Sequence, residues 1–166
     1  MKITLKEQIK ILQEDGKLPK FSNKKRDFQI VTDENIKKGS IIYIPMINDD
    51  GFVVKGNYKS SDKWIVVMGI SKDDCIVGSL LVNTKPNTFF KELGDIQFPL
   101  LKKDYSFLDY KSWLDCSKLF RIPRLRILQY GGYCGCITDS DWELIWETVK
   151  NTDFISDSDK EFFGIL

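Results

Sequence analysis

Two runs of β-branched and aliphatic residues in the middle of the chain constrain its fold more than any other feature. They span residues 64–70 and 75–82, and the polar residues 71–74 separate them. Such residues favour strands, and so short a polar connection is typical of a hairpin. Because the runs are apolar nearly throughout, we expect both strand faces to be covered, in a small closed barrel or in a sheet with helices packed on it.

Other segments extend this β-rich pattern. Residues 39–44, 112–117 and 125–129 are expected to form strands, with Gly131-Gly132 as a turn after the last of them. Gly69 and Gly78, inside the two apolar runs, fit the bends that closure of a small barrel needs. The predicted fold class is therefore mainly β with flanking helices (α+β).

Helices are predicted at both ends of the chain. Residues 4–15 combine a capping box with an apolar stripe, and a loop is expected over residues 21–27. Near the C-terminus a second capping box starts at Ser140, and Trp142, Ile145, Trp146 and Val149 share one helical face. We divide the chain into an N-terminal helical arm, residues 1–38, and a barrel with C-terminal helices, residues 39–166.

A chain of 166 residues fits one domain. No apolar run is long enough to span a membrane and no secretory signal is evident, so the expected compartment is the cytoplasm. Its four cysteines are expected to be packing thiols, and Cys134 and Cys136 lack the paired knuckles of a zinc site. These cysteines are Cys75, Cys116, Cys134 and Cys136.

The chain contains no histidine. This absence removes the commonest general base, the commonest zinc ligand and every nucleophile that depends on a histidine partner. No glycine-rich phosphate loop occurs either. Cations, hydroxyls and carboxylates remain, and they suffice for RNA cleavage by the ribose 2′-hydroxyl without a metal or another cofactor.

Charge is distributed unevenly along the chain, although its net value is only +1. Residues 1–38 carry ten Lys or Arg and six Asp or Glu, whereas residues 139–166 carry two Lys and eight Asp or Glu. Such polarity can guide a charged partner, and solvated surface charge is the alternative explanation.

The order of these segments resembles the MazF/PemK family of toxin endoribonucleases, which are small SH3-like barrels with a C-terminal helix. Residues 39–44 look like the family's first strand, residues 63–71 like its second and residues 77–84 like its third. Residues 114–122 are similar to a late strand, and residues 133–145 to the short strand that enters the final helix.

The resemblance implies a metal-independent endoribonuclease that acts on single-stranded RNA, with an antitoxin or other protein partner and a possible homodimer. The family's catalytic arginine falls on Lys63, which Trp64 follows in place of proline, and its catalytic hydroxyl falls on Thr84. A lysine neutralises phosphate but cannot form the bidentate fork of arginine. Arg121 and Arg124 are therefore assigned as substitutes for the missing arginine.

Further cations and amides near these positions are assigned to RNA contact. They are Asn83, Lys85, Arg126, Lys24, Lys25 and Arg26. Arg124 and Arg126 would share one strand face. For each residue a plain alternative stands beside this role: a turn at Thr84, an exposed strand face at the arginines and a solvated loop at residues 24–26. Asp115 is a proton acceptor or, preferably, a partner of nearby backbone.

Two other functions remain open. The chain can be a non-catalytic PemK-like barrel that binds nucleic acid or protein. It can also act by protein contact alone, with the helix at residues 4–15 as the docking element. Fold resemblance does not choose among these functions, because one scaffold hosts many of them.

Overall fold

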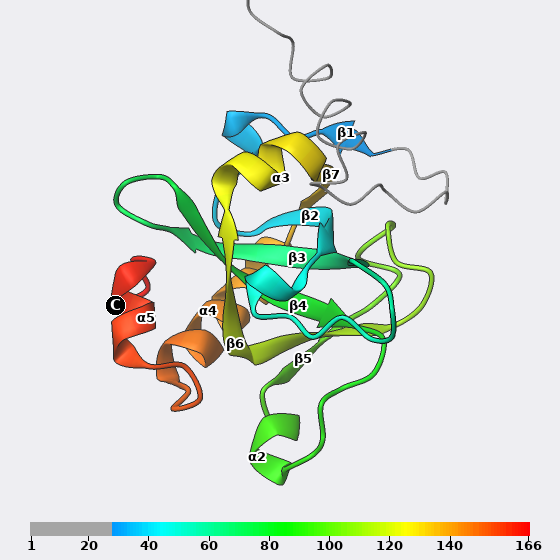
Figure 1. Ribbon diagram of the computed structural model, residues 1–166. Helices are drawn as coiled ribbons and strands as arrows, with labels where there is room; N and C mark the ends of the chain where they lie inside the picture. Colours follow the sequence, from blue (N-terminus) through cyan, green and yellow to red (C-terminus); the bar gives the residue numbers. More distant parts are fainter. Residues whose placement is uncertain (1–27) are drawn as a thin grey trace, which may run out of the picture.

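The computed structural model of the protein describes residues 28–166 (Figure 1). The helix predicted at residues 4–15 and the basic residues Lys24, Lys25 and Arg26 lie outside this range. The described strands are β1 (Gln29–Ile30), β2 (Ser40–Met46), β3 (Ser61–Ile70), β4 (Ile76–Asn83), β5 (Gln97–Leu100), β6 (Ser112–Pro123) and β7 (Gly132–Cys136). The described helices are η1 (Asp33–Asn35), η2 (Asn48–Asp50), α2 (Lys91–Gly94), α3 (Arg124–Tyr130), α4 (Asp139–Asn151) and α5 (Asp157–Phe162). The mainly β, α+β class is confirmed.

All seven described strands form one antiparallel sheet, in the order β1-β7-β2-β3-β4-β6-β5. Within residues 28–166 the end strands β1 and β5 do not pair with each other, so the sheet is not closed. The predicted SH3-like barrel is therefore not confirmed. Of the two arrangements that the apolar runs allowed, the structure has the sheet with helices packed on it.

The sheet is covered on both faces. On one face, Ile145 and Val149 of α4 and Phe163, which follows α5, join a cluster with Val66 and Leu80. The other face carries a second cluster that includes Ile127 and Tyr130 of α3. Figure 1 shows α3 (yellow) well apart from α4 (orange) and α5 (red). This double cover explains why the strand sequences are apolar nearly throughout.

Gly69 and Gly78 face each other across β3 and β4, beside a shift in the strand register. A Cβ at Gly78 would lie 2.7 Å from the Phe163 ring, and one at Gly69 would overlap the Phe163 carbonyl oxygen. Both glycines thus make room for the residue that follows α5. The sequence predicted bends at these two glycines, but it did not predict the close approach of Phe163 to them.

The structure confirms most predicted strands and corrects one of them. Residues 39–44 lie largely in β2, the two apolar runs pair as the β3–β4 hairpin, and residues 112–117 begin β6. Residues 125–129, predicted as a strand, belong to helix α3. Gly131 ends that helix in an extended conformation and Gly132 begins β7, so the predicted glycine turn is also wrong.

Helix α4 has the apolar face that its sequence predicts. Ile145 and Val149 are buried, and both indoles pack partly against the core. The helix begins earlier than predicted, because Thr138 rather than Ser140 is its N-cap and accepts a hydrogen bond from the Asp141 amide. Beyond its C-terminus, the buried ammonium of Lys160 in α5 donates to the carbonyl oxygens of Lys150 and Thr152, at 3.0 and 2.7 Å. These bonds satisfy carbonyls at the helix end and join α5 to α4.

The cysteines differ from one another in burial. Cys116 is buried, Cys134 is half-buried, and Cys75 and Cys136 are exposed, so the prediction of four packing thiols holds only in part. All four are free thiols.

We expect the Cys116 thiol to resist alkylation by iodoacetamide in the folded protein. Burial, and then the charge of Asp115, raise the pKa of this thiol from 9.0 to about 12. At neutral pH this leaves about a thousandfold less of the reactive thiolate than an ordinary cysteine has. Mass spectrometry should show early labelling at Cys75 and Cys136 and labelling at Cys116 only after urea unfolding. Equal early labelling rates at Cys116 and Cys75 would contradict the burial of Cys116.

Residues 28–38, which the sequence analysis assigned to the arm, pack on the sheet. They include β1, which pairs with β7, and the buried side chains Val31 and Ile36.

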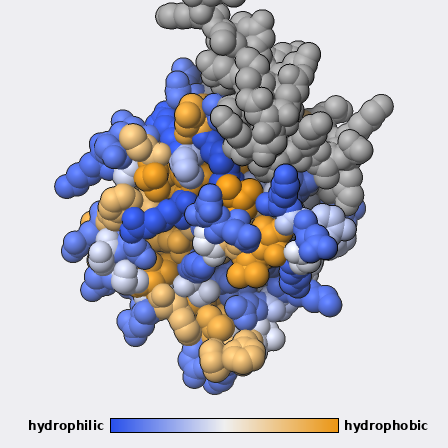
Figure 2. Space-filling view, in the orientation of Figure 1, coloured by the Kyte–Doolittle hydropathy of each residue, from blue (hydrophilic) through white to orange (hydrophobic). Residues whose placement is uncertain are grey.

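In residues 28–166 every helix is too short or too polar to cross a membrane. Figure 2 shows apolar surface at the α2 end of the molecule, where the exposed rings of Phe89 and Phe90 meet edge to face, with their centroids 4.7 Å apart.

Candidate functional site

The predicted catalytic residues lie at two ends of the sheet. Ile65 of β3 pairs with Leu81 of β4, so Lys63 and Asn83 lie near one end of these strands, and Thr84 follows at once. Arg121 pairs with Gly78 at the other end. At a rise of ~3.3 Å per residue, the strand length between the two ends is about 20 Å. The structure therefore brings Lys63 and Thr84 to the same end of the sheet and keeps Arg121 and Arg124 at the other end.

Arg121 and Arg124 are both engaged within the protein. Arg121 donates to the Asp159 carboxylate at 2.6 Å, and its guanidinium lies 4.4 Å from the centre of the Phe162 ring. Arg124 donates to Asp33 at 2.9 Å. Neither arginine faces Lys63, so neither replaces the family arginine beside it.

Arg126 is buried, so its guanidinium is not exposed to an RNA phosphate, contrary to the expected contact. Its guanidinium forms an ion pair with the buried carboxylate of Asp50 and donates to the Pro45 carbonyl oxygen at 2.6 Å. The expectation that Arg124 and Arg126 share a strand face is also wrong. They lie on helix α3, where residues two apart point in different directions.

The remaining predicted residues near Lys63 are small or exposed. Asn83 ends β4 and is half-buried, and Thr84 and Lys85 are exposed in the bend that follows. Asp115, in neighbouring β6, accepts hydrogen bonds from the Gln97 side chain at 2.9 Å and from the Ser117 backbone amide at 3.0 Å. Asp115 therefore has the structural role that the sequence analysis preferred.

Lys63 belongs to a strip of alternating lysines and aromatic rings. Its ammonium lies 5.9 Å from the centre of the Phe52 ring, and Phe52 lies 6.4 Å from Phe120. The Lys118 ammonium lies 4.7 Å from the Phe120 ring and donates to the Gly51 carbonyl oxygen at 2.8 Å. We call these four residues, Lys63, Phe52, Phe120 and Lys118, the lysine–aromatic strip.

A hollow of about 200 Å³ lies beside the strip, under the connection between β2 and β3. Its lining residues are Phe52, Val53, Val54, Lys55, Tyr58, Ser60, Ser61 and Lys63. Tyr58 is 80% exposed, so most of its ring is open to solvent. No acidic residue of the described chain lines this hollow. We call it the β2–β3 hollow.

Lys63 is the half-buried cation of this hollow. Strand alternation places it on the same face of β3 as Ile65 and Val67, where the second core cluster lies. Burial lowers the pKa of the Lys63 ammonium from its usual 10.5, and repulsion from the charge of Lys55 lowers it further. An anion placed between the two lysines would stabilise the charged form of Lys63 and so oppose both effects.

Sequence reasoning found Lys63 but missed the other residues of the site. Phe52, Lys55 and Tyr58 lie in a segment without helix or strand periodicity, which the sequence analysis left unassigned. The usable signal was the interleaving of aromatic and basic residues from 52 to 63, a pattern found in nucleic-acid-binding surfaces. Lys118 could not be found in this way, because it reaches the site from β6.

No protein-family model matches the chain, and no curated protein matches it at a significant level. The resemblance to MazF/PemK toxins stays a prediction. Among residues 28–166, no three cysteine or carboxylate side chains gather as ligands for a metal ion.

Proposed function

We propose that the protein binds single-stranded RNA at the β2–β3 hollow, with phosphate between Lys55 and Lys63 and a base stacked on Tyr58. The observation that carries this proposal is that Lys55 and Lys63 line one hollow whose described lining holds no carboxylate. Burial, and then repulsion from Lys55, lower the pKa of the Lys63 ammonium there. Like charges held close together favour a bound anion. The hydroxyls of Ser60 and Ser61, at the same hollow, add donors for phosphate oxygens.

The size and the rings of the site favour a strand of RNA over a small molecule. Whole ligands usually occupy about 300–1,000 Å³, more than this hollow offers, so it suits one part of a polymer that continues across the surface. The exposed ring of Tyr58 is open to a base, and the lysine–aromatic strip continues the basic surface toward Lys118. Unpaired bases can stack on such rings, whereas the bases of a duplex cannot.

Removing the ring or one lysine is expected to weaken RNA binding. Stacking on an aromatic side chain contributes about 1–3 kcal/mol per base, so Tyr58→Ala should lower the affinity about 5- to 150-fold. Lys63→Ala should remove about one phosphate contact and make the salt slope shallower by ~0.7. Fluorescence anisotropy with a labelled single-stranded RNA of mixed sequence, over a series of salt concentrations, measures both effects.

The matched control is Lys72→Ala, which removes the same charge from an exposed site in the β3–β4 turn, at the other end of β3 from Lys63. It should leave the affinity and the salt slope nearly unchanged. The proposal is wrong if the unmodified protein shows no saturable binding at low salt, or if Lys72→Ala weakens binding as much as Lys63→Ala does.

RNA binding should also fall as the pH rises toward the lowered pKa of Lys63. The neutral amine no longer attracts phosphate, and the loss of charge begins at a lower pH than for an ordinary lysine. Arginine stays charged throughout this range, so Lys63→Arg should retain its affinity at alkaline pH. Anisotropy titrations of both proteins between about pH 7 and 10 test this; parallel pH profiles would show that Lys63 is not the titrating group.

RNA cleavage is a second candidate, and the lowered pKa of Lys63 favours it. At any given pH a larger fraction of this amine is neutral than of an ordinary lysine, and the neutral amine can accept the proton of the ribose 2′-hydroxyl. The 2′-oxygen would then bond to phosphorus while the bond to the 5′-oxygen breaks, and the 5′-oxygen takes a proton from water or from an ammonium. The Lys55 ammonium would stabilise the added phosphate charge. The products would be a 2′,3′-cyclic phosphate and a 5′-hydroxyl.

An end-labelled RNA, incubated with the protein in a chelator, separates binding from cleavage. Metal-independent cleavage requires the 2′-hydroxyl, so an otherwise identical 2′-O-methyl RNA should bind and stay intact. Lys63→Arg should abolish cleavage and keep binding, because arginine does not give up its proton in this pH range. An intact natural RNA after prolonged incubation, with binding retained, would leave the protein as a non-catalytic RNA-binding module.

Membership of the MazF/PemK-like, SH3-like toxin class remains part of this proposal. The order β2, β3, β4, β6, β7 and α4 follows the segments in which the resemblance was found, and this order supports the proposal. Such a protein would act in the cytoplasm as a homodimer, with an antitoxin as its protein partner. Growth arrest on expression, relieved by Lys63→Ala, would support the class.

A further inference from the structure

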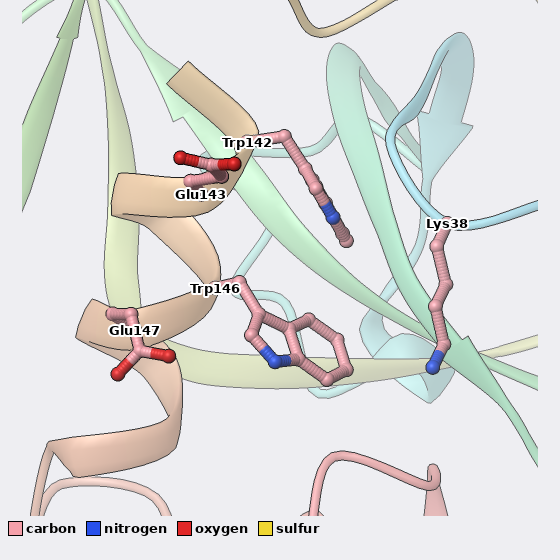
Figure 3. Close-up of a pocket in the computed structure, with 5 residues that line it drawn as sticks. All are labelled: Lys38, Trp142, Glu143, Trp146 and Glu147. Carbon is pink, nitrogen blue, oxygen red and sulfur yellow. The ribbon is translucent and has the colours of Figure 1, made fainter. Parts of the chain in front are cut away.

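A second hollow lies on the opposite face of the sheet from the lysine–aromatic strip. It measures about 540 Å³ and lies between helix α4 and the segment that enters β2. Figure 3 shows the two indoles of Trp142 and Trp146 projecting from α4 toward Lys38, with Glu143 and Glu147 on the same helix. We call this the indole hollow. The proposed RNA site makes no use of it.

The two indoles are held in place before any partner arrives. Trp142 lies against Gly39, where an added Cβ would be 3.5 Å from the ring. The ring centres of Trp142 and Trp146 are 5.6 Å apart and the planes are tilted by 38°. Both rings rest partly on the core cluster, and the rest of each ring lines the hollow. A partner therefore meets an aromatic surface that is already ordered, which lowers the entropy cost of binding.

The chain itself already places a cation in this hollow. The Lys38 ammonium lies 4.5 Å from the centre of the Trp146 ring, within the distance at which a ring face attracts a cation. Lys38 is exposed, so this contact is weak and its side chain can leave without disturbing the core. The position of Lys38 thus shows that this hollow can hold an ammonium group over the Trp146 ring.

The charges around the hollow favour a cation over a phosphate. Its lining contains two glutamates and one lysine. Residues 139–166 as a whole carry two lysines and eight acidic residues. An RNA strand would be repelled here, whereas a segment with several cations could place one over the ring faces and others beside the two carboxylates on α4.

We propose that the indole hollow binds a lysine or arginine side chain from a basic segment of a partner protein. The incoming cation takes the position of Lys38 over Trp146, and Glu143 and Glu147 pair with neighbouring cations of the same segment. Lys38 keeps the site closed until the partner displaces it. RNA and a basic protein would then bind on opposite faces of one sheet.

The probe is a fluorescein-labelled oligolysine peptide, titrated with the full-length protein and followed by anisotropy. Trp146→Leu keeps an apolar side chain but removes the π face, and should weaken binding about two- to fivefold, the strength of an exposed cation–π contact. The double variant Glu143→Gln with Glu147→Gln should weaken it further. Circular dichroism on each variant establishes that the protein stays folded, and RNA binding should stay unchanged.

Lys38→Ala gives the sharpest result, because it should strengthen oligolysine binding about two- to fivefold by removing the competing cation. Lys37→Ala removes the same charge from the adjacent exposed residue and should have a smaller effect. Equal gains from the two variants would mean that general charge attraction governs binding, and the proposal would be overturned. It would also be overturned if Trp146→Leu bound the peptide as tightly as the unmodified protein.

Discussion

Replacing Asp50 with alanine is expected to lower the free energy of unfolding by about 3–5 kcal/mol. The Asp50 carboxylate is buried, pairs with the Arg126 guanidinium and accepts a hydrogen bond from the Ile47 amide at 2.8 Å. Without it, the guanidinium stays in the protein interior, where its hydrogen bond to the neutral Pro45 carbonyl oxygen does not compensate its charge. Urea unfolding followed by circular dichroism measures the loss.

The exposed neighbour Asp49 supplies the control. Asp49→Ala removes the same charge, and should change the stability by no more than about 0.5 kcal/mol. Replacing both partners, Asp50→Leu with Arg126→Met, should recover much of the loss, because the cost comes from a buried charge left alone. A small effect of Asp50→Ala, similar to that of Asp49→Ala, would show that the pair is not buried in solution.

The same substitution should impair RNA binding, since Asp50 ends η2 and the chain continues directly into Gly51 and Phe52. The Gly51 carbonyl oxygen accepts a hydrogen bond from the Lys118 ammonium, and Phe52 lies in the lysine–aromatic strip. The buried ion pair therefore fixes the start of the segment that forms the β2–β3 hollow. Restored stability in the double variant should bring RNA binding back with it.

Phe163→Ala is expected to destabilise the protein by a similar amount, about 3–5 kcal/mol. The Phe163 ring is 1% exposed and belongs to the core cluster beneath α4 and α5. It fills the space over Gly78, so truncation leaves a cavity that two backbone strands cannot close by small movements. Thermal unfolding by calorimetry gives the change.

Phe162→Ala is the matched comparison, because this neighbouring ring is 39% exposed. It should cost much less, although it removes one ring from beneath the Arg121 guanidinium. Gly78→Ala probes the same contact from the sheet side and should also destabilise, by about 1–3 kcal/mol, through overpacking. Equal losses from Phe162→Ala and Phe163→Ala would argue against the packing of the chain end on the sheet.

Much of the sheet could be predicted because its strands are long, β-branched and apolar, as in the β3–β4 hairpin. Helix α4 was recognisable from the spacing of its apolar residues over several turns. Helix α3 was not, since its seven residues are too few to separate a period of two from one of 3.6. In the folded protein Ile127 and Tyr130, three residues apart, are both buried in the second core cluster, and this spacing matches one face of a helix.

The site was only partly predictable for a related reason. Whether an arginine faces solvent depends on partners far away in the sequence, such as Asp50, which is 76 residues before Arg126. Sequence alone therefore assigned all three arginines near Pro123 to the RNA site, Arg121 and Arg124 as catalytic residues and Arg126 as an RNA contact. Lys63 was found by resemblance, and the rings around it come from the β2–β3 connection and from β6, which only the folded chain brings together.

Strand β5 forms one edge of the sheet, and this position limits how other chains can join the protein. It has only four residues, and one of them, Pro99, carries no amide hydrogen to offer an incoming strand. Extension of the sheet from this side by a foreign peptide is therefore discouraged, and so is end-to-end polymerisation of the protein through β5. A partner that binds at the β5 edge is therefore expected to do so through side-chain contacts rather than by adding a strand.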